Sequence, residues 1–340
     1  MSLLFPSATH CEISDKYTGP YLTVVIDTEE EFPWHERFNR SNRSVDCIQQ
    51  QYLAQDIFRE YGIVPTYVID HPVVDDDRAV EVLKEWADKG ECLIGTHLHP
   101  WVNPPYDEEV NEYNSYPGNL PPALEAEKLR ILTGYIEERF GHRPVVYKAG
   151  RYGVGANTEK TLQDLGYQVD CSVVPYTNLS REQGPDFRGL AGEPFWINKE
   201  QGLFEVPLTR DFPGLLSGVL PDLGPRIYDQ IASGLFLKCR VPGILARLGL
   251  MERIPLTPEG VSVEEHKRLT EYLVKRHHRF FSYTYHSSTL LVGGSPYAQN
   301  EAERNSFVER IDRFLDFFVN VCGGQSATPL QIRDMALEKL

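Results

Sequence analysis

Short apolar runs alternate with longer amphipathic segments along most of this chain. Seven runs rich in β-branched and aromatic residues predict strands, at about 21–27, 63–70, from 91 onward, 145–148, 168–174, 203–208 and 280–286. Between and after them, apolar residues recur at helical spacing over about 44–61, 76–89, 123–140, 158–165, 263–278 and 301–321. Strands that alternate with helices favour a parallel sheet, and seven parallel strands can close into a (β/α) barrel.

One segment, 212–253, interrupts this alternation. It is rich in Leu, Ile, Gly and Pro, and the spacing of its apolar residues predicts helices at about 228–238 and 244–250. We expect a helical insertion that either packs on the barrel or touches a membrane surface, since apolar insertions usually find a partner. Neither a Pro/Ser-rich linker nor a repeat divides the chain, so we expect a single domain over 1–340 with its core at about 20–322.

Composition narrows the classes of function. The chain has 34 basic and 49 acidic residues and a formal net charge of −15, which argues against nucleic-acid binding because contact with phosphates needs a basic surface. Six cysteines are scattered without a C-x-x-C pair, as is typical of a reducing compartment. The first residues form no signal-like apolar region, and no apolar run reaches the length of a membrane span. We therefore expect a cytoplasmic protein, while its oligomeric state stays open.

Acidic and imidazole side chains follow two of the predicted strands. The first strand leads into Asp27 and Glu29, and the third leads into His97 and His99. Side chains two residues apart share one face of an extended strand, so each pair can converge on a single ion. Three protein ligands and an open position are typical of a catalytic zinc site. Isolated histidines more often lie at surfaces or hydrogen-bond in a core, but the matching acidic strand end favours a metal site.

Further polar residues mark the later strands. Lys148 and Arg151 follow the fourth strand, Asp170 lies in the fifth and His286 ends the seventh. Taken singly, each has an ordinary structural explanation as a surface charge, a loop cap or a core histidine. In a parallel barrel, however, the carboxyl ends of all strands meet on one rim, where reactive groups collect. The joint placement of these residues therefore predicts one active site.

Five segments in order resemble the motifs of the polysaccharide deacetylases, the NodB-like carbohydrate esterases of family 4. They are 24–32, 94–101, 148–153, 166–175 and 283–288. The resemblance is greatest to the branch that contains WalW-type lipopolysaccharide-biosynthesis proteins. It implies a distorted seven-stranded barrel and a hydrolase that uses a divalent metal to remove N- or O-linked acetyl groups from a sugar or polysaccharide precursor.

The resemblance also implies a ligand set and a base. Glu29, His97 and His99 would bind the metal, usually zinc, and Asp27 would be the general base. An acid-x-acid pair stands where the family has adjacent aspartates, so Asp27 and Glu29 could exchange these two roles. The two histidines stand two residues apart rather than four, because the later position is Trp101.

The remaining roles implied by the resemblance fall on later motifs. Arg151 would hold the base Asp27, and the backbone N–H of Tyr152 would help to bind the oxyanion. His286 would be the general acid, oriented by Asp170. Lys148 is the alternative to Arg151 as the partner of the base; lysine lacks the planar fork with which arginine grips a carboxylate.

Aromatic residues in the expected rim loops could form a platform for a sugar ring, although core packing explains each of them equally well. They are Trp34, Trp101, Tyr106 and Tyr152. Two other functions compete with deacetylation. One is an amidohydrolase-type metallohydrolase that acts on another amide, although its His-x-His pair lies on the first barrel strand rather than the third. The other is a catalytically inactive sugar-binding barrel.

Overall fold

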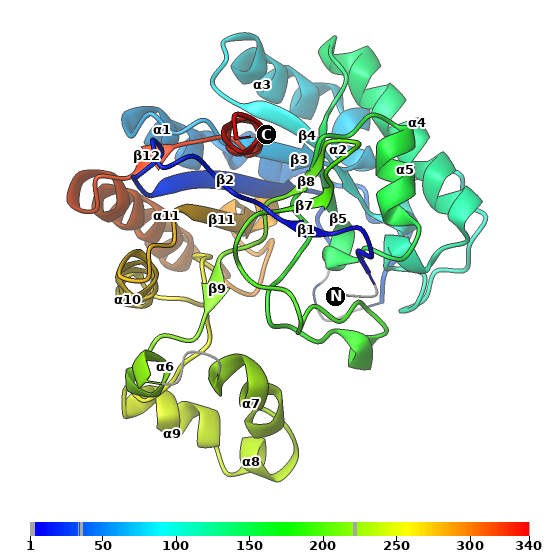
Figure 1. The fold of residues 1–340 in the computed structure, drawn as a ribbon. Coiled ribbons are helices and arrows are strands. Elements are labelled where there is room, and N and C mark those ends of the chain that lie inside the picture. Colours follow the sequence, from blue (N-terminus) through cyan, green and yellow to red (C-terminus); the bar gives the residue numbers. More distant parts are fainter. Residues whose placement is uncertain (1–3, 33, 35–36, 220–222, 340) are drawn as a thin grey trace.

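The computed structural model describes residues 4–32, 34, 37–219 and 223–339, and its central feature is a curled sheet (Figure 1). Seven parallel strands follow one another in the order β8-β6-β5-β4-β3-β2-β11. These are β2 (Tyr21–Thr28), β3 (Thr66–Ile69), β4 (Leu93–Leu98), β5 (Val146–Ala149), β6 (Val169–Asp170), β8 (Leu203–Glu205) and β11 (Phe280–His286). The distorted seven-stranded (β/α) barrel expected from the sequence is confirmed.

Short strands extend this sheet. β7 (Phe195–Asn198) pairs antiparallel with β8, and β1 (Thr9–His10) pairs antiparallel with β7. β12 (Gln325–Ser326) pairs with the start of β2. The sheet curls so far that Thr209, beyond β8, reaches β11 at the other end, where its N–H donates to the Ser282 carbonyl at 3.3 Å. This bond links the two ends of the curled sheet.

Strand parity divides the core into two layers. One face of the strands lines the barrel interior, where Val25, Val68, Val146 and Cys171 pack together. The opposite face packs against the surrounding helices through a larger cluster that includes Tyr147. Because side chains alternate between the faces of a strand, a residue's position along its strand decides which layer it enters.

Helices cover the outer face of the sheet (Figure 1). They are η1 (Asp46–Gln50), α1 (Tyr52–Glu60), α2 (His71–Asp75), α3 (Asp77–Asp88), α4 (Pro122–Phe140), α5 (Thr158–Asp164), α10 (Val263–Val274), α11 (Glu301–Asp316) and η7 (Phe317–Val321). The last helix, α12 (Pro329–Leu337), instead packs on the interior layer, where Ile332 and Ala336 join its apolar cluster. The helix expected over 44–61 is a 3₁₀ turn followed by α1, and the helix expected to reach 278 ends at Val274. A capping box between Ser262 and Glu265 fixes the start of α10. No helix in the described ranges is long and apolar enough to cross a membrane.

The helical insertion, 212–253, leaves the barrel through a two-stranded ribbon (Figure 1). The ribbon pairs β9 (Arg210–Asp211) with β10 (Ile254–Pro255). Beyond it lie α6 (Leu215–Val219), α7 (Leu223–Ile231), α8 (Gly234–Lys238) and α9 (Val241–Arg247). The single helix expected over 228–238 is broken at Gly234, whose φ of 55° lies in the left-handed region that glycine adopts readily.

Candidate metal centre and active site

Strand parity brings the expected strand-end residues into the barrel interior. Asp27 has the same parity as the interior residue Val25, and Glu29 follows two residues later. His286 of β11 lies opposite Asp27 in the ladder, and His97 of β4 lies opposite Lys148 of β5. Neighbours in register point to the same face of a sheet. Acidic and basic groups from four strands therefore meet at the carboxyl end of the barrel.

Glu29, His97 and His99 form a compact group of possible metal ligands. Glu29 Oε2 lies 3.3 Å from Nε2 of His97 and 3.3 Å from Nε2 of His99. One ligand atom from each of the three residues lies within 4.8 Å of the others, and all three side chains are buried. Two imidazoles and a carboxylate with room for a further ligand match the donor set of catalytic zinc sites.

Hydrogen bonds at Nδ1 decide which ring nitrogen of His97 and His99 faces Glu29. His97 Nδ1 lies 2.9 Å from the Lys148 carbonyl, which can only accept, so Nδ1 carries the hydrogen and Nε2 offers its lone pair. Burial lowers the pKa of His97, and it lowers that of His99 to about 4. Both rings are therefore neutral, as metal ligands must be. Glu29 Oε1 is buried and has no hydrogen-bond partner, so the three residues fit a divalent cation.

A second layer of acids orients His99. Glu30 Oε2 lies 2.8 Å from His99 Nδ1, and Glu30 Oε1 accepts a hydrogen bond of 2.6 Å from Trp101 Nε1. The Trp101 ring stacks on His99 at 4.2 Å between centroids. Burial raises the pKa of Glu30 to about 8 and that of the adjoining Asp70 well above its usual range, so the two acids retain at least one proton at neutral pH. Such partners commonly fix the orientation of a ligating histidine.

Asp27 is held by Lys148, not by Arg151 as expected. Lys148 Nζ donates to Asp27 Oδ1 at 2.5 Å and to Thr284 Oγ1 at 2.8 Å. Burial favours the neutral form of Asp27, but the charge and hydrogen bond of Lys148, together with the charge of His286, outweigh it and lower the pKa of the carboxyl. Asp27 is thus a buried, ionised carboxylate within the barrel.

Arg151 lies at the rim because the backbone leaves the strand before it. Arg151 and Tyr152 have φ angles of 54° and 59°, which turn the chain out of β5 after Ala149. The Arg151 guanidinium then meets Glu112 Oε1 at 2.7 Å and lies over the Tyr116 ring at 4.2 Å. Within the described ranges it forms no ion pair with Asp27.

His286 is oriented by Glu259, not by Asp170 as expected. Its Nδ1 lies 2.8 Å from Glu259 Oε2, and its backbone N–H donates to Glu259 Oε1 at 3.0 Å. Its Nε2 faces Asp27 Oδ2 at 3.6 Å. Burial disfavours the imidazolium, but the carboxylates of Glu259, Glu29 and Asp27 outweigh it and raise the pKa of His286 well above its usual range. The ring is therefore protonated at neutral pH.

Asp170 lies on the other face of the sheet. It is opposite Tyr147 and Glu205 in the ladders, so its side chain points towards the helices. There it accepts a hydrogen bond from Ser172 Oγ. Burial raises the pKa of Asp170 to about 7 and that of Glu205 well above its usual range. Both acids therefore lie outside the barrel interior.

A cavity of about 340 Å³ opens onto the ionisable groups. Three of the four expected platform residues line it, namely Trp34, Trp101 and Tyr152. Trp101 is almost fully buried, whereas the Trp34 ring lies 4.9 Å from that of His286 and stays partly exposed. Tyr106, the fourth, lies outside the lining, and its hydroxyl donates to the Val102 carbonyl. Phe32 and Phe38 also line the cavity and make part of its wall apolar. Neither was expected as a site residue.

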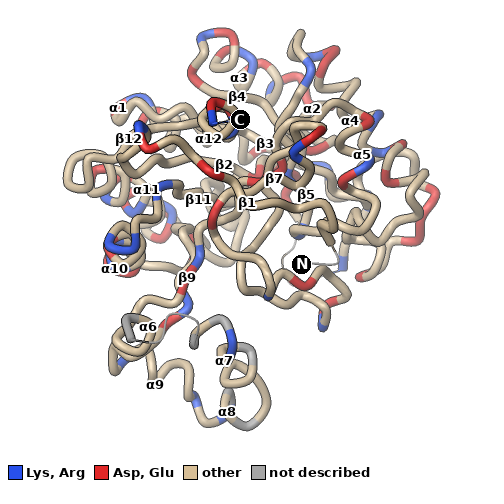
Figure 2. The backbone as a smooth tube through the Cα atoms, in the orientation of Figure 1, with Lys and Arg blue, Asp and Glu red and all other residues tan. Residues whose placement is uncertain are grey.

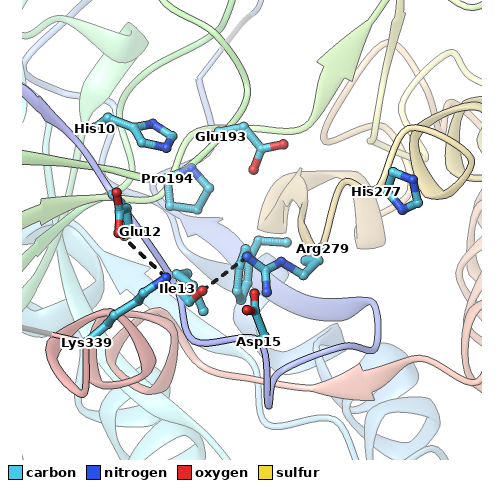
Figure 3. Close-up of a pocket in the computed structure, with 11 residues that line it drawn as sticks. His10, Glu12, Ile13, Asp15, Glu193, Pro194, His277, Arg279 and Lys339 are labelled. Atoms are coloured by element: carbon cyan, nitrogen blue, oxygen red, sulfur yellow. Dashed lines mark hydrogen bonds and ion pairs between the residues drawn. The ribbon is translucent and has the colours of Figure 1, made fainter.

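A second cavity, of about 380 Å³, lies at the opposite end of β11 (Figure 3). Its cations are already satisfied by the protein. Arg279 donates to the carbonyls of Ser14 and Tyr17, and Lys339 pairs with Glu12 at 3.6 Å. Both cations of this cavity are therefore engaged by neighbouring groups of the protein.

Comparison with solved structures supports the fold. A candidate polysaccharide deacetylase from Mycobacterium smegmatis aligns with a TM-score of 0.57 at 15% identity, covering 97% of this chain and 94% of that one. A candidate polysaccharide deacetylase from Pseudomonas aeruginosa PAO1 gives a TM-score of 0.54 at 14% identity, covering 94% and 91%. Puue allantoinase gives 0.54 at 14% identity, covering 98% and 95%. No family model matches the chain, and no curated protein matches it. The chain thus has the fold of NodB-like (β/α) barrels.

The buried ion pair generates a prediction about stability. Lys148→Ala leaves the Asp27 carboxylate buried without its partner, so we expect the free energy of unfolding to fall by about 3–5 kcal/mol. Urea denaturation followed by circular dichroism measures this. The double variant Asp27→Asn with Lys148→Met removes both charges and should recover part of the loss. A Lys148→Ala variant as stable as the wild type would show that the pair is not buried as described.

Proposed function

We propose that the chain is a metal-dependent hydrolase that removes an acetyl group from a sugar or polysaccharide precursor. The observation that carries this proposal is the convergence, in one cavity, of Glu29, His97 and His99 with an ionised Asp27 and a protonated His286. A ligand set, a base and an acid on one rim are what hydrolysis of an amide or ester requires. The shared fold with candidate polysaccharide deacetylases supports the choice of an acetylated sugar.

Glu29, His97 and His99 would hold the metal, which we propose to be zinc because zinc favours imidazole and carboxylate ligands. Once bound, the ion would supply Lewis acidity to the acyl oxygen and to water. Glu29 lies between the two imidazoles, 3.3 Å from each Nε2. Asp27 is engaged by Lys148 instead. This difference supports Glu29 as the ligand and Asp27 as the base, rather than the reverse.

Asp27 accepts the proton of the attacking water in this proposal. The ion pair with Lys148 keeps the carboxylate charged in a buried site, and the second bond of Lys148, to Thr284 Oγ1, keeps the ammonium in place. His286 stands on the other side of Asp27 and gives its proton to the departing amine or alkoxide. Glu259 fixes the ring and favours its charged form, so a proton is available where the leaving group needs one.

The partly exposed aromatic side chains are suited to bind a pyranose. Trp34 and Tyr152 line the cavity beside His286, and Phe32 stacks on Trp34 at 5.5 Å. Sugar rings present apolar C–H faces that pack on aromatic rings. Trp101 would act indirectly, by positioning His99. Its buried ring stacks on the imidazole of His99, and its N–H donates a hydrogen bond to Glu30.

Hydrolysis of an amide that is not an acetyl group is the second candidate, because one structure with the same fold is named an allantoinase. The same ligand set, base and acid would serve such a reaction. A catalytically inactive sugar-binding barrel is less favoured, since buried acids and histidines in these protonation states have a cost that binding alone does not require.

We also propose three finer attributes, namely a branch of the family, a pathway and a location. The motif order of the sequence favours the WalW-type branch and a role in lipopolysaccharide biosynthesis. All six cysteines are free, and four of them are buried. Such free thiols are typical of a reducing compartment and support a cytoplasmic location.

Acetate release from a panel of acetylated sugars tests the function. Zinc-loaded protein should release acetate from at least one N- or O-acetylated sugar. Asp27→Asn should bind metal as the wild type does but lose on the order of a hundredfold or more in turnover, because the base is gone. Binding of the sugars without acetate release by the wild type would favour the inactive barrel. Release of ammonia or ring opening of cyclic amides alone would favour the second candidate.

The contact between Glu259 and His286 predicts a shift in the pH profile. The acid is active while protonated, so the rate should fall as pH rises through its raised pKa. Glu259→Gln removes a carboxylate that favours the imidazolium, and the alkaline limb of kcat should move to lower pH. Asp170→Asn, which alters an acid outside the barrel interior, is the control and should leave that limb in place. If Asp170→Asn moved the alkaline limb and Glu259→Gln did not, Asp170 would be the partner of His286, as expected from the sequence.

A further inference from the structure

The helical insertion presents large apolar side chains to solvent. Phe236 of α8 is 53% exposed, Ile244 of α9 is 48% exposed and Leu248, just beyond α9, is 62% exposed. Leu215 at the start of α6 is 70% exposed. Isolated exposed apolar residues are ordinary, but several within one short segment mark an interaction surface.

The charge of this segment is opposite to that of the chain. Residues 234–251 contain three basic and no acidic residues, whereas the whole chain has a net charge of −15. The basic residues are Lys238, Arg240 and Arg247, and all three are exposed. None of the described residues forms an ion pair with them. Figure 2 shows the stretch around α8 and α9 in blue and tan without red.

Basic and apolar side chains share the outward face of α9. Ile244 precedes Arg247 by three residues and Leu248 by four, which places these three on one side of the helix, and Arg240 comes directly before its first residue. All four are exposed, while the intervening Leu245 and Ala246 are half-buried. A helix in a globular protein normally turns its polar face to water. Here the outward face mixes aliphatic side chains with arginines, as in helices that lie at a lipid interface.

We propose that the surface formed by Phe236, Lys238, Arg240, Ile244, Arg247 and Leu248 docks the protein on an anionic lipid bilayer. The apolar side chains enter the boundary of headgroups and acyl chains, and the three cations remain at the anionic headgroups. The acidic barrel does not prevent this, because charges further apart than the Debye length of about 10 Å are screened. The insertion projects away from the barrel on the ribbon of β9 and β10 (Figure 1).

This surface is separate from the proposed active site. Its six residues are absent from the lining of the cavity that holds Asp27 and His286. Docking would bring the barrel to substrates held at a membrane, but the binding itself does not depend on deacetylation. A test that follows membrane binding and the hydrolysis of a soluble substrate separately therefore distinguishes failure of one proposal from failure of the other.

Cosedimentation with lipid vesicles tests the proposal. Wild-type protein should bind vesicles of phosphatidylcholine with 30% phosphatidylglycerol and stay in solution with pure phosphatidylcholine. The variant Lys238→Gln/Arg240→Gln/Arg247→Gln should lower the partition coefficient on the order of a hundredfold, at about fivefold per charge. Phe236→Ser/Ile244→Ser/Leu248→Ser should abolish binding. All variants should hydrolyse a soluble substrate at the wild-type rate.

A matched control changes exposed apolar residues outside the insertion. Val274, Val321 and Leu337 are also at least 37% exposed, so Val274→Ser/Val321→Ser/Leu337→Ser should bind vesicles like the wild type. Absence of binding by the wild type, equal binding to neutral vesicles, or retained binding by the two insertion variants would overturn the proposal. So would a dimer of the wild type in light scattering that becomes a monomer in the serine variant of the insertion, because a second copy would then cover the surface.

Discussion

The buried ion pair between Asp27 and Lys148 is the interaction on which the rest of the site depends. It joins β2 to β5 across the barrel interior, and the bond from Lys148 to Thr284 extends it to β11. A carboxylate this deeply buried would take up a proton without a cation beside it. The pair therefore does two things at once, since it ties strands that are not neighbours and it keeps a base ionised. The field of that same carboxylate helps to keep His286 charged.

Around this pair, each ionisable ring has a partner that sets its protonation. His97 donates to the Lys148 carbonyl, His99 meets Glu30 and His286 meets Glu259. The same chemical group thus occurs in two states within one cavity, neutral where a metal would bind and charged where a proton would be given. Burial lowers the pKa of the first two rings, and nearby carboxylates overcome burial at the third.

Much of the fold could be predicted from the sequence because the strands and helices carry clear periodicities. The seventh strand was predicted with the bounds that the structure has, and the interior position of the strand-end acids and histidines follows from the same rule of alternation. The same rule also predicts the faces on which Asp170 and Lys148 lie. Val169 and Cys171 are apolar interior residues, so Asp170 between them had to face the helices. Lys148 follows the interior residue Val146 by two, which favoured it over Arg151.

The remaining partners could not be predicted in this way. Glu259 lies between β10 and α10, outside the regular strands, and only the path of the chain after the insertion brings it to His286. Glu30 follows Glu29 directly, and nothing local in the sequence indicates that its side chain meets His99. The broken helix at Gly234 and the left-handed turn at Arg151 depend on single backbone angles, which periodicity does not reveal.

X-ray absorption at the zinc edge of the metal-loaded protein tests the central claim most directly. The account predicts two imidazole nitrogens at about 2.0–2.1 Å and a carboxylate oxygen at about 2.0–2.2 Å. His97→Ala should lose one imidazole or the metal altogether, whereas His142→Ala, which changes an exposed histidine, should match the wild type. A spectrum with sulfur ligands, one without imidazole, or one unchanged in His97→Ala would contradict the account.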